Sequence, residues 1–326
     1  MGRISDCTPS FTVSPKAINL MMEIAEMVNG DERVSIIPDL TLRKQLRIIS
    51  IQSSLQIEAN SLSVEDVTDI INGVRVLGPP RDILEVKDAY SAYELLPELD
   101  PFKTDDLLRA HGVMMSGLVK EAGAFRTVGV NVVNSRTGEV IHHAPDPELV
   151  PNLIKNLIKW ASASEYHPLI VGCVFHHEFE FIHPFRDGNG RMGRMWQTLI
   201  LSKWMPVFEW LPVESMIRDR QMEYYRAIQE ADQGDTSSFI DFMLEAIRDA
   251  LKKWGKNKSS VRMKVLELIK SGEYTNSVEI AQLLNVSTST IERVIYSLRN
   301  DNLIIRKGSK KTGYWVFVGS IDDEQD

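Results

Sequence analysis

The most informative segment of this 326-residue chain reads His183-Pro184-Phe185-Arg186-Asp187-Gly188-Asn189-Gly190-Arg191-Met192-Gly193-Arg194. An apolar helical pattern ends just before it, and Pro184 cannot continue that helix because its ring lacks the backbone N–H and clashes with the preceding turn. Gly188 and Gly190 allow a sharp turn and a close approach to a ligand, and Asn189 is expected to cap the helix that follows. The segment therefore predicts a glycine-rich loop at a helix N-terminus, where free N–H groups and the helix dipole favour phosphate.

The side chains of the same segment fit a phosphate site. Asp187 offers the oxygen ligands that Mg²⁺ takes beside substrate phosphates. Arg191 and Arg194 lie three residues apart on one side of the predicted helix and can fork onto phosphate oxygens. His183 titrates near neutral pH and can act as a general base, whereas Phe185 is expected to anchor the loop in the core. Each feature alone is usually structural, but their combination within twelve residues favours a phosphate site.

The segment matches H-P-F-x-[D/E]-G-N-G-R-x-x-R, the signature of Fic domain proteins, at every fixed position, and the chain resembles that family over roughly residues 40–250. Four further stretches resemble parts of the family. Residues 123–132 are similar to its hairpin flap, 143–160 to the helix after the flap, 176–182 to the helix before the signature, and Tyr224-Tyr225 to a tyrosine pair. The resemblance implies a mainly α fold, a Fic-type helical bundle with a β-hairpin flap, here followed by a small winged helix–turn–helix domain.

The resemblance implies an enzyme, a nucleotidyltransferase of the protein adenylyltransferase type, with ATP as substrate and Mg²⁺ held by Asp187. His183 would be the catalytic base, deprotonating a Tyr, Ser or Thr hydroxyl of a target protein. Nucleotide and phosphate contacts would come from Phe185, Asp187, Gly188, Asn189, Gly190, Arg191, Met192, Gly193, Arg194, Tyr224, Tyr225 and Asp232. The flap edge that clamps the target by strand addition would be formed by Val130, Asn131, Val132 and Val133.

Two other readings of the function stay open. Some relatives transfer UMP or phosphocholine, and some remove AMP, so the same site supports other chemistry. A function from another class is a DNA-binding regulator whose Fic-like body only senses nucleotide. The intact set of His183, Asp187, Arg191 and Arg194 argues against that reading, because a sensor does not need a base.

A second motif lies upstream, where Ser54 and Glu58 stand four residues apart on a predicted helix and so face one side of it. The segment resembles the inhibitory [S/T]-x-x-x-E-[G/N] motif of Fic proteins, in which the glutamate pairs with the second arginine of the signature, here Arg194. Ala59 stands where Gly or Asn is expected, which leaves open where the helix ends. Further along, Ser63 followed by Asp66 predicts an N-cap for a helix over residues 64–71.

The charge of the chain is uneven. The formal net charge is −8, which for the whole chain disfavours a nucleic-acid binder. Residues 256–318, however, carry 11 basic against 5 acidic residues. The pattern there, a helix over 261–270, helices over 277–284 and 287–300 and strands over 303–306 and 314–318, predicts a winged helix. Its polar and basic residues 287–311 suit either DNA phosphates or a protein partner, and both stay open.

These features predict four parts of the chain. We expect an N-terminal helical segment over 1–40, a Fic domain over 41–255 that includes an inhibitory helix at about 41–60, a winged helix–turn–helix over 256–320 and an acidic tail over 321–326. No apolar run is long enough for a membrane span, and two cysteines make no disulfide framework, so a cytoplasmic location is expected. A homodimer is a further expectation, by analogy with similar proteins.

Overall fold

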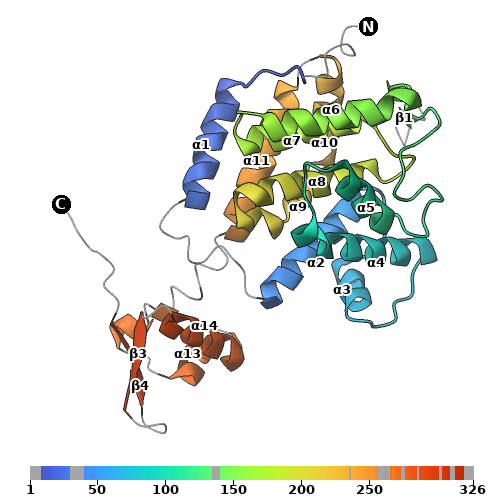
Figure 1. The fold of residues 1–326 in the computed structure, drawn as a ribbon. Helices are drawn as coiled ribbons and strands as arrows, with labels where there is room; N and C mark the ends of the chain where they lie inside the picture. The colour runs from blue at the N-terminus through green and yellow to red at the C-terminus, as the bar shows by residue number, and fades with distance from the viewer. Residues whose placement is uncertain are drawn as a thin grey trace. The chain divides into compact units, whose positions relative to one another are not determined.

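The computed structural model describes residues 9–29, 40–133, 140–234, 236–255, 261, 265–266, 268–272, 276–284, 286–300, 303–308 and 313–318. The chain divides into two compact units, of which the larger ends at Lys252 and the smaller begins at Lys253 (Figure 1). The sequence analysis places this boundary after residue 255. The predicted acidic tail, residues 321–326, lies outside the described residues. So do residues 1–8 and 30–39 of the predicted N-terminal segment.

The larger unit is built almost entirely of helices, so the predicted mainly α fold is confirmed. Its α-helices are α1 (Pro15–Asn29), α2 (Leu40–Ile57), α3 (Val64–Ile71), α4 (Pro80–Glu94), α5 (Thr104–Met114), α6 (Val150–Ala163), α7 (Pro168–Ile182), α8 (Asn189–Trp204), α9 (Val213–Asp219), α10 (Gln221–Asp232) and α11 (Ser237–Ala250). Short helical turns are η2 (Leu96–Glu98), η3 (Pro147–Leu149), η4 (Pro206–Glu209) and the π-helical η5 (Leu251–Gly255). Two strands, β1 (Asn131–Val133) and β2 (Val140–His143), pair antiparallel with Asn131 opposite His143.

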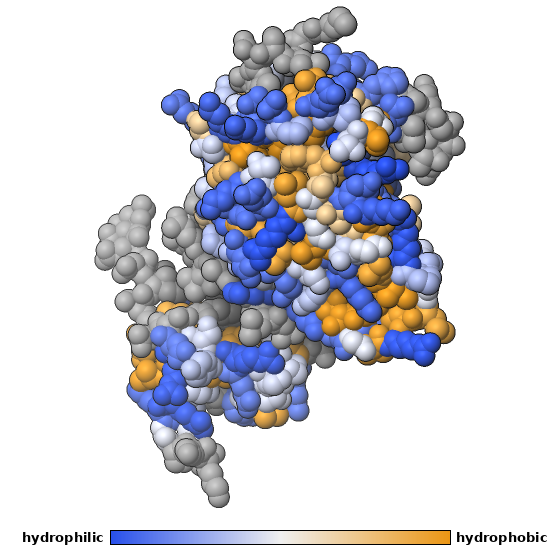
Figure 2. Space-filling model, turned by 45° about the vertical axis from the view of Figure 1, so that its right-hand side comes forward, coloured by the Kyte–Doolittle hydropathy of each residue, from blue (hydrophilic) through white to orange (hydrophobic). Residues whose placement is uncertain are grey.

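Helices α7 and α8 form the centre of this unit, with α9, α10 and α11 packed near them (Figure 1). Both are buried on nearly every side, which is typical of helices inside a core rather than at its surface. The large side chains that fill the core between them include Phe175, Phe179, Phe185 and Trp196, each fully buried. Figure 2 shows hydrophilic residues spread over the visible face of the larger unit, with an apolar area at its lower edge. The signature segment therefore connects two helices that are both buried in the core.

Helix α2, which carries the predicted inhibitory motif, packs against α9 and α4. It ends at Ile57 in a Schellman-type turn, in which the Asn60 N–H donates to Leu55 O and the Ala59 N–H donates to Gln56 O. Ala59 adopts the left-handed conformation that this turn requires, with φ 67°. The alanine that departs from the family motif thus takes the backbone conformation usually given to glycine, and the turn fixes Glu58 at the end of the helix.

The smaller unit contains α13 (Ser277–Leu283), α14 (Thr288–Asn300) and an antiparallel hairpin of β3 (Ile304–Lys307) and β4 (Tyr314–Phe317). Its core holds Val265, Leu266, Ile269, Ile280, Ala281, Ile291, Ile295, Leu298 and Ile304. The helices and strands follow the order expected of a winged helix–turn–helix, and that assignment stays a prediction. Of the residues offered for DNA or protein contact, Lys310 and Lys311 lie outside the described residues.

Candidate active site

The signature loop leaves α7 and enters α8 through two left-handed residues, His183 with φ 51° and Gly188 with φ 85°. Gly188 is the N-cap of α8, and no side chain caps that end of the helix. The expectation that Asn189 caps α8 is therefore wrong. Its amide instead closes the loop, since Nδ2 donates to Phe185 O and Oδ1 accepts from the Phe185 N–H, both at 2.9 Å. The uncapped first turn of α8 keeps its N–H groups for another acceptor.

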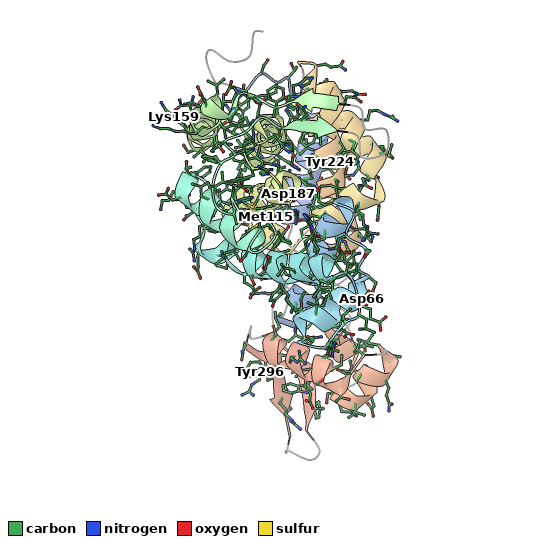
Figure 3. All side chains as sticks on the ribbon, turned by 90° about the vertical axis from the view of Figure 1, so that its right-hand side faces the viewer. Asp66, Met115, Lys159, Asp187, Tyr224 and Tyr296 are labelled. Atoms are coloured by element: carbon green, nitrogen blue, oxygen red, sulfur yellow. The ribbon has the colours of Figure 1, made fainter. Side chains whose placement is uncertain are left out.

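Gly188 is required for a steric reason as well as for its φ angle. A Cβ there would come within 2.6 Å of the sulfur of Met115, which follows α5. Figure 3 shows Met115 and Asp187 next to each other in the middle of the larger unit. A side chain at residue 188 would thus push the loop away from α5.

A histidine that was not predicted from the sequence packs against the signature loop. His111 of α5 stacks on Phe185, with ring centroids 3.6 Å apart and planes 3° apart. Its Nδ1 accepts from the Gly123 N–H at 3.0 Å, so its Nε2–H is the donor that reaches Asp187 O at 3.1 Å. Burial lowers the pKa of His111 to about 4, which keeps the ring neutral and this tautomer in place.

The Arg126 side chain donates hydrogen bonds to four carbonyl groups. The sequence indicated this residue only as part of the flap segment. Its guanidinium donates to His183 O (2.8 Å), Val128 O (3.0 Å), Pro145 O (2.6 Å) and Ile182 O (3.3 Å). Its backbone N–H also donates to Pro184 O at 3.0 Å. The side chain is buried, so these bonds fix the start of the signature loop relative to the segments on either side of the hairpin.

His183 is arranged as a neutral imidazole with one nitrogen held and one nitrogen free to accept a proton. Nδ1 lies 3.2 Å from Glu180 O, and because a carbonyl only accepts, Nδ1 carries the hydrogen. The lone pair of the neutral ring is then on Nε2. Burial lowers the pKa of His183 to about 4. At neutral pH the ring is therefore in the form that a general base needs.

Asp187 is partly exposed and already has donors on both carboxylate oxygens. Oδ1 accepts from the Gly188 N–H at 2.7 Å and from Arg191 Nη2 at 3.3 Å. Oδ2 accepts from Arg81 Nη2 at 3.0 Å, a contact between α4 and the loop that the sequence did not indicate. Arg191 itself is buried, and within the described part of the chain its Nε and Nη1 make no hydrogen bond. Nη1 lies 3.6 Å from Glu85 Oε1, which is an ion pair without a hydrogen bond, and donors of a buried arginine that make no hydrogen bond fit an anionic ligand.

Arg194 carries the contact predicted for the second arginine. Its Nη2 donates to Glu58 Oε1 at 2.7 Å and to Ser54 O at 3.0 Å, and its Nε donates to Ser54 Oγ at 3.0 Å. The side chain of Arg194 is 1% exposed, and that of Glu58 is 37% exposed. A Cβ at Gly190 would overlap Glu58 Oε1, so the carboxylate lies directly against the first turn of α8. An anionic group thus already occupies the N-terminal end of this helix.

The residues expected to contact adenosine do not form one open surface. Tyr224 is 1% exposed, and its hydroxyl lies 3.1 Å from His176 Nε2. Tyr225 is more exposed, and its hydroxyl donates to Ile57 O at the end of α2. Asp232 lies 3.0 Å from His177 Nε2. Contact of these three residues with a nucleotide stays a prediction, and Tyr225 is the one that touches the predicted inhibitory helix.

Besides His111, a second buried titratable group was not predicted from the sequence: Glu180 of α7. Its Oε1 has no hydrogen-bond partner among the described residues. Burial raises the pKa of Glu180 to about 8, against the opposing effect of the Arg194 charge. A Cβ at Gly193 would come within 2.7 Å of that oxygen, which accounts for the glycine at this position of α8. Glu180 is therefore protonated at neutral pH and leaves Glu58 as the charged partner of Arg194.

The flap residues are described only in part. Asn131, Val132 and Val133 form β1, and Val130 precedes it. β1 pairs with β2 in a two-stranded sheet, so within the described residues its second edge carries no strand. The neighbouring strand is anchored to α7, because His142 Nε2–H donates to Phe181 O at 2.8 Å. An open strand edge fits strand addition by a target segment.

The site fits Mg²⁺ only together with a ligand that brings further oxygens. Among the described residues, no group of three His, Cys, Asp or Glu side chains could hold a metal ion. Asp187 supplies one carboxylate, and Mg²⁺ characteristically binds one or two carboxylates and completes its shell with water and substrate phosphates.

No helix in the described ranges is long and apolar enough to cross a lipid bilayer.

Comparisons with known proteins show which family the chain is similar to. A sequence model of the Fic/DOC family matches residues 101–201. The crystal structure of a Fic family protein from Desulfovibrio desulfuricans G20 is 39% identical, with a TM-score of 0.72, and covers 96% of this chain and 99% of that chain. Fic-1 (residues 134–508) from Caenorhabditis elegans is 21% identical with a TM-score of 0.60, covers 74% of this chain and 71% of that chain, and shows the fold alone.

A curated relative, protein adenylyltransferase fic-1 of Caenorhabditis elegans, is 28% identical over 231 residues. The match covers 65% of this chain and 42% of the relative. The chain therefore spans less than half the length of that protein.

Proposed function

This chain belongs to the Fic family, and from that premise we propose that it transfers AMP from ATP to a hydroxyl group of a target protein. The observation that carries the proposal is the Glu58 carboxylate on Arg194, held against the first turn of α8. An anion therefore fits at the position where the signature expects the terminal phosphates. The relative named as a protein adenylyltransferase supports the same chemistry.

In the proposed reaction, His183 Nε2 takes the proton of the target hydroxyl while its oxygen attacks the α-phosphorus. A new O–P bond forms, the bond from the α-phosphorus to the bridging oxygen breaks, and pyrophosphate leaves. The Nδ1–H bond to Glu180 O and the Arg126 bond to His183 O hold the imidazole and its backbone in register. Most of the rate enhancement would come from positioning and from charge stabilisation.

The phosphate ligands in this proposal are all groups that the structure leaves with unused or exchangeable donors. Arg191 offers the buried Nε and Nη1, and the first turn of α8 offers backbone N–H groups. Mg²⁺, when bound through Asp187, would neutralise charge on the phosphates. Arg194 would exchange the Glu58 carboxylate for a phosphate oxygen.

Because ATP binding would require this exchange, the contact of the Glu58 carboxylate with Arg194 would inhibit the enzyme, and we call it the Glu58 brake. As long as its carboxylate stays on Arg194, the terminal phosphate lacks its arginine and meets a like charge beside Gly190. Ser54 strengthens the arrangement, since it holds Arg194 in the pose that Glu58 requires. The proposed resting enzyme is therefore autoinhibited, and removal of the carboxylate should release it.

The test is intact-mass spectrometry of the purified protein after incubation with ATP and Mg²⁺. Glu58→Gly should gain the mass of AMP on its own hydroxyl residues, and wild type should gain little. Glu58→Gly combined with His183→Ala should remain unmodified, and Glu165→Gly, at an exposed glutamate away from the site, serves as the matched control. Equal labelling with and without His183 would refute the role of the base, and an adduct of a different mass would refute AMP transfer.

A further inference from the structure

The exposed arginine at the start of α4, Arg81, occupies the side of Asp187 that faces away from its own loop. Arg81 Nη2 donates to Asp187 Oδ2 at 3.0 Å, while the other oxygen is taken by Gly188 and Arg191. Neither carboxylate oxygen is therefore free of a donor. A metal ion approaching Oδ2 would meet the positive charge of the Arg81 guanidinium at the same oxygen, and like charges at this separation repel.

Arg81 is itself held in place by a neighbour on the same helix. Its Nε lies 3.3 Å from Glu85 Oε1, four residues further along α4. Glu85 Oε2 accepts from the Asn60 amide at 2.9 Å, and Glu85 Oε1 lies 3.6 Å from Arg191 Nη1. Asn60 follows the turn that ends the Glu58 helix. A continuous set of polar contacts thus runs from the end of the brake helix through Glu85 and Arg81 to Asp187.

The exposure of the two partners indicates which contact can open. The Arg81 side chain is 60% exposed and that of Asp187 is 41% exposed. An ion pair this exposed contributes little to stability, so Arg81 can leave Asp187 without disturbing the core. Arg191, by contrast, is buried and donates to Oδ1 from the first turn of α8. Oδ2, the oxygen under Arg81, is the one that a metal ion would take.

We propose that Arg81 is a positioning residue whose positive charge competes with a divalent cation for Asp187 Oδ2 and lowers the affinity for the cation unless nucleotide phosphates bind with it. The inference rests on the proposed function, because it takes Asp187 as the metal ligand. The proposal adds a second inhibitory contact, between Arg81 and Asp187, to the contact between Glu58 and Arg194. Nucleotide phosphates supply the extra oxygens that let the cation displace the guanidinium.

The test measures cation affinity directly. Mn²⁺ is titrated into the Glu58→Gly protein at saturating ADP, and free Mn²⁺ is followed by its electron paramagnetic resonance signal. Adding Arg81→Gln should tighten Mn²⁺ binding by about fivefold, the largest gain expected from removing one exposed ion pair. Arg81→Lys should give an intermediate affinity, because it retains the charge but not the guanidinium fork. Lys87→Gln removes the same charge from an exposed position of the same helix and should change nothing.

Two results would overturn the inference. Unchanged or weaker Mn²⁺ binding in Arg81→Gln would mean that the arginine does not compete with the cation, and weaker binding of ADP as well would make it a phosphate ligand instead. An equal gain from Arg81→Gln in a protein that also carries Asp187→Asn would mean that the effect does not act through Oδ2. Failure of the proposed function would look different, because Glu58→Gly would then gain no AMP in the mass measurement, whatever its Mn²⁺ affinity.

Discussion

Replacing Glu58 by glutamine should make the protein more active and less stable at the same time. The amide keeps the size of the side chain but leaves the buried Arg194 charge without its counter-ion. Removing one partner of a fully buried pair costs about 3–5 kcal/mol. Glu58 is 37% exposed and Ser54 still accepts two hydrogen bonds from Arg194, so solvent and Ser54 offset part of the loss. The expected destabilisation is about 2 kcal/mol.

Thermal unfolding followed by circular dichroism measures this effect. For a unit of this size, about 2 kcal/mol corresponds to a fall in Tm of roughly 4–8 °C. ATP with Mg²⁺ should raise the Tm of Glu58→Gln more than that of wild type, because phosphate then supplies the missing negative charge and stabilises the folded state by mass action. Glu165→Gln, an exposed site, should leave the Tm within about 1 °C of wild type.

One outcome would refute the reasoning. If Glu58→Gln gains activity but its Tm without nucleotide equals or exceeds that of wild type, then the carboxylate does not stabilise Arg194 in the resting protein. The brake would then act through repulsion between the Glu58 carboxylate and the terminal phosphate rather than by pairing with the arginine.

Three further changes follow from single residues. Ala59→Gly should raise the free energy of unfolding by about 1 kcal/mol, read out as a higher Tm, because it relieves a left-handed alanine; a lower Tm would contradict the strain. The rate of Glu58→Gly against pH should fall only as pH drops through about 4, where His183 becomes protonated, and a midpoint at the ordinary histidine value would contradict its burial. Glu180 keeps a proton in the folded chain up to about pH 8 that the unfolded chain loses above about 4.5, so stability falls as pH rises between these values. Glu180→Gln should flatten the dependence of Tm on pH over that range, and an unchanged slope would contradict the buried acid.

Elements that depend on neighbours in sequence were predictable. The predicted N-cap at Ser63 is confirmed, and it forms a capping box in which the Ser63 hydroxyl accepts from the Asp66 N–H and the Asp66 carboxylate accepts from the Ser63 N–H. The four-residue spacing of Ser54 and Glu58 likewise predicted that both point in one direction, whereas their partner Arg194 was expected from the family resemblance and not from the spacing. In each case the deciding geometry spans no more than one turn of helix.

The errors and omissions arise where distant segments meet. Asn189 was expected at a cap, but its amide satisfies both the N–H and the C=O of buried Phe185, whereas a cap would satisfy one donor. His111 lies 76 residues from the Asp187 carbonyl that it binds, and Arg81 lies 106 residues from its carboxylate partner. No periodicity relates such positions. The segment containing Arg126 was visible as part of the flap pattern, but its four carbonyl partners follow only from the packing.

The candidate site contains an internal counterpart for each charge that a nucleotide and its cation would bring. In the proposed function, Glu58 stands where a phosphate would bind Arg194, and Arg81 stands where a cation would bind Asp187. Neutralised in this way, the site avoids the cost of a buried unpaired arginine and of a carboxylate facing the α8 loop alone. Activation is then an exchange of partners rather than the assembly of a site. Because the exchange on Asp187 involves exposed groups and that on Arg194 a buried one, the second is the larger barrier, which is why Glu58 rather than Arg81 should set the resting activity.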